Sequence, residues 1–162
     1  MDLRVMEASD LDGAVRVWQA ANIARGKHPS DERVARVAQK LQEPTTMPYV
    51  AASDAGIVGM ALLEPCRAED GAGAVVSDAL HISMVFIDPV SQRQGVGSRL
   101  MRYALDSAHA SGISSVSLWT DCENTGARKL YEALGMKPTR PRRVSETVEW
   151  VLYELDLESA SI

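Results

Sequence analysis

The sequence predicts an α+β protein in which helices pack against a mixed sheet. Apolar residues recur at helical spacing in residues 11–21, 34–41, 97–109 and 127–134. Elsewhere they form short runs or alternate with polar residues, which is typical of strands. The strand-like segments first form a hairpin and later a strand–helix–strand unit, so the predicted order is β-α-α-β-β-β-α-β-α-β.

The first half of the chain predicts a strand, two helices and a hairpin. Residues 3–6 form a short, mostly apolar run that predicts the first strand, and Asp10 after it is expected to cap the first helix. Ser30 is expected to cap the second helix. Residues 49–52 and 57–63 are apolar and flank a Ser-Asp-Ala-Gly turn, which is typical of a hairpin.

The middle of the chain predicts a β-α-β crossover. Residues 68–74 are small or polar and predict a flexible loop. An apolar strand over 80–87, a helix over 97–109 and a strand over 116–120 follow it. Such a unit joins parallel strands by a right-handed connection.

The C-terminal segment predicts one more helix, a small strand and a last, longer strand. The helix begins at Asn124 or Thr125, and a small strand is expected near 136–139. The basic run 140–143 is expected in a solvated loop, or alternatively as a site for an anionic group. Residues 148–157 alternate, which predicts a half-buried strand whose edge could pair with a second copy in a homodimer.

The composition excludes several classes of protein. The 162 residues include 17 Lys and Arg against 22 Asp and Glu, a net charge of −5, which argues against binding a nucleic-acid backbone. No apolar stretch is long enough to span a membrane, and the N-terminus lacks a signal-peptide pattern. Two cysteines, Cys66 and Cys122, are too few for a disulfide framework. We expect a single cytoplasmic domain over residues 1–162 with free thiols.

Residues 82–101 carry the most informative pattern, a buried strand followed by a small, polar turn and a helix. Gly95 and Gly97 allow a close approach of an anion to the main chain. The amides of residues 94–98 are expected to point into the space before the helix, at the positive end of its dipole, a geometry that binds phosphate. A Walker loop needs Lys-Ser/Thr after its last glycine, and a dinucleotide loop needs glycine where Leu100 stands, so both nucleotide patterns fail.

Two motifs indicate a family. The stretch Gln92-Arg93-Gln94-Gly95-Val96-Gly97 matches Gln/Arg-x-x-Gly-x-Gly/Ala and resembles the acyl-CoA-binding motif of the GCN5-related N-acetyltransferase (GNAT) family. Residues 124–136 are similar to the family's Asn-x-x-Ala-x-x-x-Tyr-x-x-x-Gly-Phe helix, with Met136 in place of Phe. The resemblance covers about residues 3–157. It implies a mixed, mostly antiparallel sheet of six to seven strands, flanked by about four helices.

The resemblance implies an enzyme that transfers acetyl from acetyl-CoA to a primary amine without a metal ion. Direct attack in a ternary complex is expected. An enzyme acting on protein N-termini or lysines and a non-catalytic acyl-CoA-binding module are the alternatives. The residues implied in binding acetyl-CoA are Val85, Ile87, Gln92, Arg93, Gln94, Gly95, Val96, Gly97, Ser98, Asn124 and Tyr131.

The chemistry requires a base for the amine, a donor for the thioester carbonyl and an acid for the leaving thiolate. By register with the family, the backbone N–H of Val85 faces the carbonyl and the Ile87 backbone bonds the pantetheine arm. Tyr131 matches the family's general acid, or is simply an aromatic residue on the apolar face of its helix. His81, on the same strand face as Val85, is either a base or a strand-end histidine bonded to a neighbour or to water. Asn124 either contacts CoA or caps its helix.

The acceptor pocket is less well defined by the sequence. The resemblance places it against the first two helices, the 65–78 loop and the C-terminal strands. The periodicity places two of the candidate lining residues, Trp18 and Trp150, in the core. If acidic residues surround the pocket, they would favour a cationic amine. The candidates are Trp18, Asn22, His28, Trp119 and Trp150.

Overall fold

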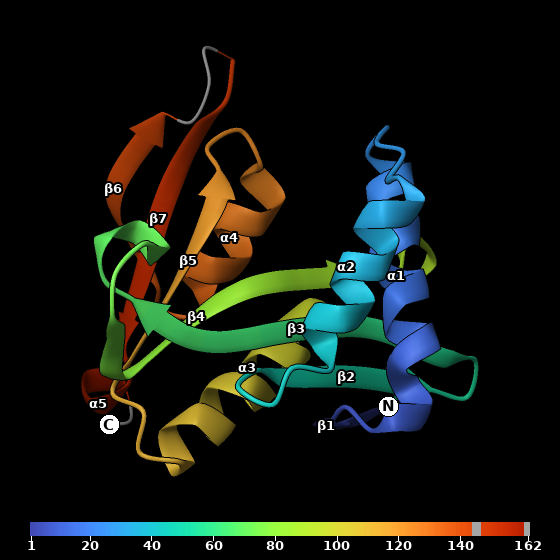
Figure 1. Cartoon of the computed structure of the whole chain (residues 1–162), viewed down its shortest axis with the longest axis horizontal. Helices are drawn as coiled ribbons and strands as arrows, with labels where there is room; N and C mark the ends of the chain where they lie inside the picture. Colours follow the sequence, from blue (N-terminus) through green and yellow to red (C-terminus); the bar gives the residue numbers. More distant parts are fainter. Residues whose placement is uncertain (144–146, 161–162) are drawn as a thin grey trace. The chain divides into compact units, whose positions relative to one another are not determined.

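The described part of the chain has seven strands and four long helices (Figure 1), which confirms the predicted fold class. The computed structural model describes residues 1–143 and 147–160. The strands are ordered β1-β2-β3-β4-β5-β7-β6, and β4 and β5 run parallel. The strands are β1 (Asp2–Val5), β2 (Met47–Ser53), β3 (Gly56–Arg67), β4 (Val75–Ile87), β5 (Ser115–Asp121), β6 (Lys137–Arg143) and β7 (Glu149–Asp156). The helices are α1 (Leu11–Ala24), α2 (Asp31–Leu41), α3 (Val96–Ala110), α4 (Thr125–Ala133) and the four-residue α5 (Leu157–Ala160).

The chain divides into two compact units. Unit 1 comprises Met1–Leu63 and Met84–Ala104, and unit 2 comprises Glu64–Ser83 and Leu105–Ile162. Strands β3 and β4 and helix α3 continue from one unit into the other. The expectation of a single domain stays a prediction.

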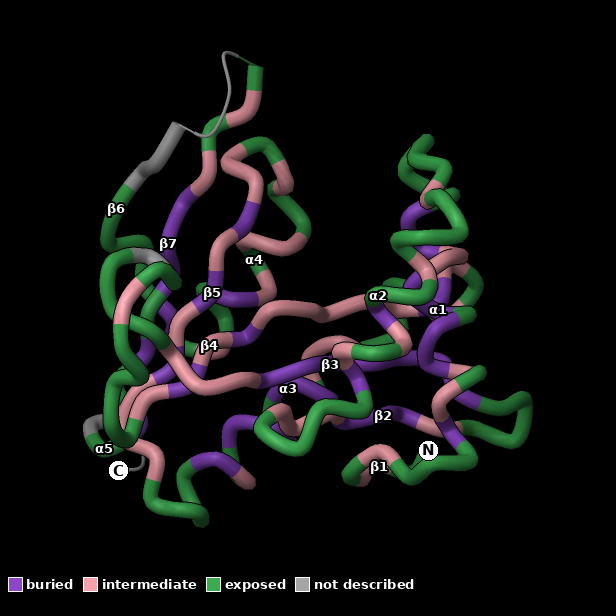
Figure 2. The backbone as a smooth tube through the Cα atoms, viewed as in Figure 1, coloured by how far each residue is buried: buried purple, intermediate pink, exposed green. Residues whose placement is uncertain are grey.

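Unit 1 has its core between the β2–β3 hairpin and helices α1 and α2. Figure 2 shows buried backbone along β2 and β3, where Val50 and Leu62 are fully buried. Trp18 of α1 is only 4 % exposed and joins this core. Each large apolar side chain buried in this way contributes about 1.5–3 kcal/mol. Ser30 accepts a hydrogen bond from the Arg33 amide (3.2 Å), so the predicted cap of α2 is confirmed.

Asp10 does not cap α1 with its side chain, which corrects the sequence prediction. A short 3-10 helix, η1 (Ala8–Asp10), precedes α1, and the buried Asp10 carboxylate accepts the Glu7 amide at 2.9 Å. The same carboxylate forms an ion pair with Arg4 of β1. The hydrogen bond from Arg4 lowers the pKa of Asp10 below its ordinary value. Asp10 therefore connects the first strand to the first helix.

Unit 2 is built on β7, which lies between β5 and β6. Residues 151–153 of β7 are buried on both faces, and Tyr153 is fully buried. The predicted C-terminal strand is therefore confirmed, but it is not half-buried over residues 151–153 and its edge is not open. Its sequence does alternate, but β6 occupies the edge of the sheet and pairs with β7.

Three segments differ in extent from the sequence prediction. Strand β4 begins at Val75, five residues before the expected start at position 80. The expected loop over 68–74 contains a short 3-10 helix, η2 (Glu69–Gly71). The basic run 140–143 belongs to β6 and not to a loop, because its backbone pairs with β7. Of its three arginine side chains, only that of Arg140 lies among the described residues.

Candidate functional site

The glycine-containing loop of unit 1 follows β4 and leads into α3. Asp88 ends the strand, and its carboxylate accepts the Val90 amide at 3.3 Å, starting the short 3-10 helix η3 (Pro89–Ser91). Two residues then adopt the left-handed region, Arg93 at φ 64° and Gly95 at φ 79°. This conformation favours glycine and turns the chain into α3, which begins at Val96.

The start of α3 provides backbone donors. The Arg99 amide bonds to the Gly95 carbonyl at 3.1 Å, so it belongs to the helical ladder. The amides of residues 96–98 precede that bond and face out of the helix end, where the dipole is positive. Because α3 has 15 residues, this dipole is fully developed. Of the predicted residues 92–98, the first four thus form the end of the loop and the last three the first turn of α3. Such an arrangement is typical of phosphate sites, and the binding role of these residues stays a prediction.

Two glutamine side chains stabilise this loop from within. Gln92 donates to the Ile87 carbonyl at 3.3 Å, and Gln94 donates to the Val90 carbonyl at 3.4 Å. Both glutamines and Arg93 are exposed. All three side chains therefore lie at the surface, where they can reach a ligand, and the two glutamines also hold the loop.

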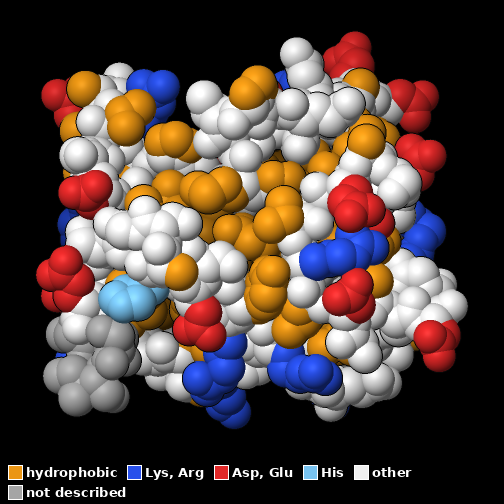
Figure 3. Space-filling model, turned by 90° about the horizontal axis from the view of Figure 1, so that it is seen from below, with side chains coloured by type: hydrophobic (Ala, Val, Ile, Leu, Met, Phe, Trp, Pro, Cys, Tyr) orange, Lys and Arg blue, Asp and Glu red, His pale blue; other side chains and the backbone are white. Residues whose placement is uncertain are grey.

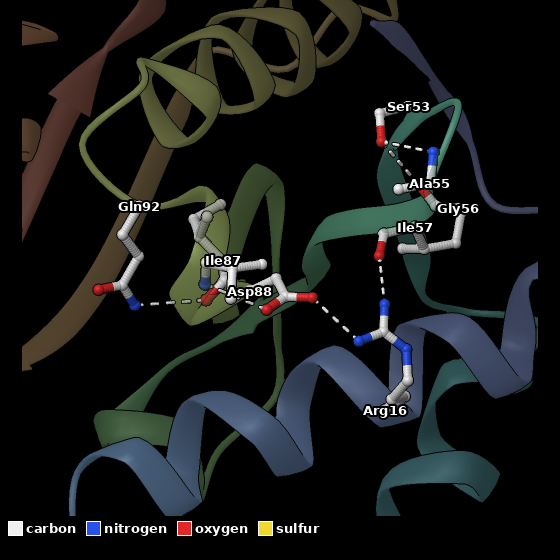
Figure 4. A network of polar contacts seen from close by, with 9 residues as sticks. Arg16, Ser53, Ala55, Gly56, Ile57, Ile87, Asp88 and Gln92 are labelled. Carbon is white, nitrogen blue, oxygen red and sulfur yellow. Dashed lines mark hydrogen bonds and ion pairs between the residues drawn. The ribbon is translucent and has the colours of Figure 1, made fainter.

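Arg16 of α1 fixes the beginning of the loop (Figure 4). Its Nη1 donates to the Asp88 carboxylate at 2.9 Å, and its Nη2 donates to the Ile57 carbonyl at 2.6 Å. The Asp88 amide in turn donates to the Val58 carbonyl at 2.8 Å. A helix, a strand and the loop are thus joined at Asp88. The sequence prediction missed Arg16 because 72 residues separate it from Asp88.

The absence of a side chain at Gly59 lets α3 pack closely on β3. A Cβ at this position would lie 3.0 Å from Ile87, 3.3 Å from Val96 and 3.4 Å from Leu100. The side chains of Ile87 and Val96 therefore pack inside unit 1. What these two predicted residues can offer a ligand is their main chain.

Val85 and Ile87 lie in the last part of β4, in unit 1, and both are half-buried. In unit 2, β4 and β5 pair over residues 79–81 and 115–117. The strand runs on from there, and Val85 lies four residues past His81. The predicted role of the Val85 amide stays a prediction.

Unit 2 contains a cavity of about 460 Å³ on one face of its strands. That volume is within the range of small-molecule sites. The wall includes three glutamates, two arginines and a histidine, together with aromatic and aliphatic side chains. The lining residues are Glu64, Pro65, Cys66, Arg67, Ala68, Glu69, Gly71, His81, Ser117, Trp119, Arg140, Leu152 and Glu154.

His81 lines this cavity and is held by Ser117. Its Nδ1 lies 2.9 Å from the Ser117 Oγ, which in turn lies 4.0 Å from the Cys66 Sγ. Ser117 is thus a bonded neighbour of the kind expected if His81 is a structural residue at the end of its strand. The contact fixes the imidazole ring, which still lines the cavity. The pairing of β4 with β5 places Ser117 opposite His81, which local sequence patterns do not reveal.

Tyr131 lies on α4 in unit 2 and is 8 % exposed. Its ring packs against Tyr153 with 5.9 Å between the centroids. Arg128 donates to the Tyr153 hydroxyl at 2.9 Å, and this hydrogen bond raises the pKa of Arg128 above its ordinary value. Asn124 accepts the Ala127 amide at 3.1 Å, so the capping interpretation of Asn124 is confirmed. Neither Tyr131 nor Asn124 lines the cavity that contains His81.

The candidate acceptor residues fall in different places. Trp119 lines the cavity of unit 2, whereas Trp18 is buried in the core of unit 1. Asn22 is also buried in unit 1 and donates to the Trp18 carbonyl at 2.8 Å. His28 is exposed in the turn between α1 and α2, and Trp150 is half-buried.

The acidic excess of the chain does not form one patch on the face drawn in Figure 3. Acidic side chains lie there in several separate places, some of them next to basic ones. Glutamates and arginines likewise share the wall of the cavity in unit 2. The net charge of −5 therefore gives no simple preference for a cationic ligand.

Three further features bear on the class of site. Within the described ranges, His, Cys, Asp and Glu side chains do not gather in any group of three or more that could hold a metal ion. None of the helices found there is both long and apolar enough to cross a membrane. Cys66 and Cys122 are free and half-buried.

Comparisons with known proteins agree with the motifs. The family model described as "Acetyltransferase (GNAT) family" matches residues 14–136, more than half of the chain. A mycothiol acetyltransferase from Beutenbergia cavernae is 38% identical over 79 residues, which are 43% of this chain and 27% of that protein. The chain spans less than half the length of the curated relatives that it matches first.

Solved structures show the same fold. The ribosomal-protein-S18-alanine N-acetyltransferase from Escherichia coli has a TM-score of 0.78 at 22% identity, covering 96% of this chain and 93% of that one. An aminoglycoside 6'-N-acetyltransferase complexed with coenzyme A has a TM-score of 0.77 at 13% identity, covering 97% of both chains. The fold, the loop before α3 and the match of the family model lead to one conclusion: the chain belongs to the GNAT acetyltransferase family.

Proposed function

We propose that the protein is an acetyl-CoA-dependent N-acetyltransferase that acts on a primary amine by direct attack in a ternary complex. The loop of residues 92–98 carries this proposal. Arg93 and Gly95 in the left-handed region deliver consecutive amides at the start of a 15-residue helix. Such a set of amide donors fits the pyrophosphate of acetyl-CoA. The space beside Gly95 is open to a ligand, because no atom lies within 4 Å of the position that a Cβ would take there.

In this proposal acetyl-CoA supplies the activated acetyl thioester, and the chain binds and moves protons around it. The Val85 amide donates to the thioester carbonyl oxygen as negative charge develops there. His81 accepts a proton from the amine, which ordinarily titrates near ~10.4 and must be neutral to attack. Tyr131 gives its phenolic proton to the departing sulfur.

Support for His81 as the base comes from its position in a cavity of small-molecule size. The Ser117 hydroxyl holds one ring nitrogen, which orients the imidazole. A histidine with an ordinary pKa near ~6.5 can accept a proton at neutral pH. We propose that this cavity receives the amine acceptor.

The first experiment is acetyl-CoA binding by calorimetry, followed by release of free thiol in the presence of a panel of amines. Absence of acetyl-CoA binding would overturn the proposal. Binding without thiol release from any amine or peptide would favour the non-catalytic module. Release with peptides alone would favour an enzyme that acts on protein N-termini or lysines, and the Escherichia coli structural relative is named for such a reaction.

Two variants test the assigned residues. Tyr131→Phe should lower kcat and spare CoA binding. The control is Tyr103→Phe, at a half-buried tyrosine on α3, and it should change neither quantity.

The second variant, His81→Ala, should remove the rise of kcat/KM between about pH 5.5 and 8. The control is His109→Ala, at an exposed histidine at the end of α3, and it should leave the pH profile unchanged. An unchanged pH profile in His81→Ala would eliminate His81 as the base. The cytoplasmic location and the homodimer stay predictions.

A further inference from the structure

Two rows of side chains line the cavity of unit 2, and each row consists of residues that lie opposite one another on neighbouring strands. The first row is His81, Ser117 and Glu154, because His81 is opposite Ser117 and Ser117 is opposite Glu154. The second row is Trp119, Leu152 and Arg140 by the same reasoning. All six residues line the cavity. Strands β5 and β7 carry one residue of each row, and along these two strands the rows are two residues apart, which is about 7 Å.

The first row can bind and deprotonate an ammonium group. The Glu154 carboxylate lies at the rim, and its Oε1 accepts the Thr139 hydroxyl at 2.6 Å, which fixes its direction. A carboxylate so held attracts a cation. His81, oriented by Ser117 at 2.9 Å, lies in the same row and can take the proton.

The second row can bind an apolar body and an anion. The Arg140 guanidinium carbon lies 5.7 Å from the centre of the Trp119 ring, a cation–π contact that orients the guanidinium. Leu152 lies between these two residues in the register and is 7 % exposed. A guanidinium has five N–H donors in a planar fork that matches a carboxylate. The ring and Leu152 supply an apolar surface beside it.

We propose that the acceptor is a small primary amine that carries a carboxylate about 7 Å from its nitrogen, joined by a hydrocarbon chain. This inference rests on the proposed acetyltransferase function and names its acceptor class. The ammonium binds at Glu154 and His81, the chain lies along Trp119 and Leu152, and the carboxylate binds Arg140. An α-amino acid has both charges on one carbon and cannot reach both rows. The cavity volume of about 460 Å³ accommodates such a molecule.

The test is a series of straight-chain amino acids of increasing length, from glycine to 6-aminohexanoate, with n-pentylamine, which has the amine but no carboxylate, as the reference. Thiol release from acetyl-CoA gives kcat/KM for each amine. The value should rise with length and be largest for 5-aminopentanoate or 6-aminohexanoate. Since a hydrogen bond to a charged group is involved, these should exceed n-pentylamine by about tenfold to a hundredfold.

Variants of one strand locate the anion site. Arg140→Gln should abolish the preference for 6-aminohexanoate over n-pentylamine, and Arg140→Lys should restore part of it. Lys137→Gln is the matched control, because Lys137 is an exposed cation on β6 that does not line the cavity. The preference should be unchanged in that variant.

The outcomes separate the inference from the proposed function. Equal kcat/KM for 6-aminohexanoate and n-pentylamine, or a preference that survives Arg140→Gln, would overturn the acceptor class and leave the acetyltransferase intact. Turnover of peptides without turnover of any small amino acid would do the same. Failure of acetyl-CoA to bind would overturn the proposed function itself.

Discussion

Arg16 joins α1 to the end of β4, and its replacement tests how firmly the loop before α3 must be held. The guanidinium bonds to the Asp88 carboxylate at 2.9 Å and to the Ile57 carbonyl at 2.6 Å. Asp88 is buried at 9 % exposure and also accepts the Val90 amide, the first part of the loop. Arg16→Ala removes both bonds and leaves a buried carboxylate without its cation.

The expected loss of stability follows from these contacts. A hydrogen bond to a charged group contributes about 1.5–3 kcal/mol in a buried setting. The Arg16 side chain is 52% exposed, so water screens its charge and the lower part of that range applies. We expect Arg16→Ala to lower the free energy of unfolding by about 1–2 kcal/mol. Arg16→Lys should lose about half of this, because one ammonium cannot bridge both acceptors as a planar guanidinium does.

Urea unfolding measures the stability, and calorimetry measures the Kd for CoA. If Asp88 positions the loop, Arg16→Ala should also raise the Kd by roughly fivefold, equivalent to about 1 kcal/mol. Arg36→Ala, at an exposed arginine of α2, is the control and should change neither quantity. A full loss of stability with unchanged CoA affinity would refute the positioning role. Unchanged stability would refute the energetic reasoning itself.

Three further changes have defined expectations. Gly59→Ala should destabilise unit 1 by about 1–3 kcal/mol in urea unfolding, because its Cβ would meet Ile87 at 3.0 Å; wild-type stability would show that the packing can relax. Asp10 has a lowered pKa, so its contribution is present above its unfolded pKa near ~3.9 and is lost as pH falls through the folded value. Asp10→Asn should therefore flatten the acid limb of a stability–pH curve, and a curve of unchanged slope would contradict this. Arg128→Ala should lower the urea midpoint of unfolding, since it removes the donor to the buried Tyr153 hydroxyl. In a Tyr153→Phe background the same substitution should lower the midpoint less, and an equal loss in both backgrounds would contradict this.

Local patterns predicted those parts of the molecule that local forces determine. Ser30 and Asn124 cap their helices because a side-chain oxygen and an amide two or three residues later suffice for the bond. The loop of residues 92–98 was predictable for the same reason, since glycine at position 95 and the following helix act within a few residues. Asp10 shows the limit of this reasoning. Its type favours a cap, but Arg4 on the neighbouring strand provides a stronger partner.

Long-range pairing decided what the patterns missed. Alternation in residues 148–157 correctly indicates a strand, but it does not reveal that β6 pairs with the edge of that strand. Likewise, 36 residues separate His81 from Ser117, and only the parallel pairing of β4 with β5 brings them together.

The two parts of the proposed active site differ in the same way: one depends on a local motif and the other on long-range strand pairing. The acetyl-CoA loop depends on a short contiguous motif, so its position can be recognised from residues 92–98 alone. The proposed acceptor site depends on register across β4, β5, β7 and β6. In the chain, helix α3 separates β4 from β5, and helix α4 separates β5 from β6. A one-residue slip of β6 against β7 would turn Arg140 to the opposite face of the sheet and leave every motif intact. Acceptor specificity can therefore change through strand register and single substitutions at Trp119 or Arg140, while the acetyl-CoA site and the fold remain the same.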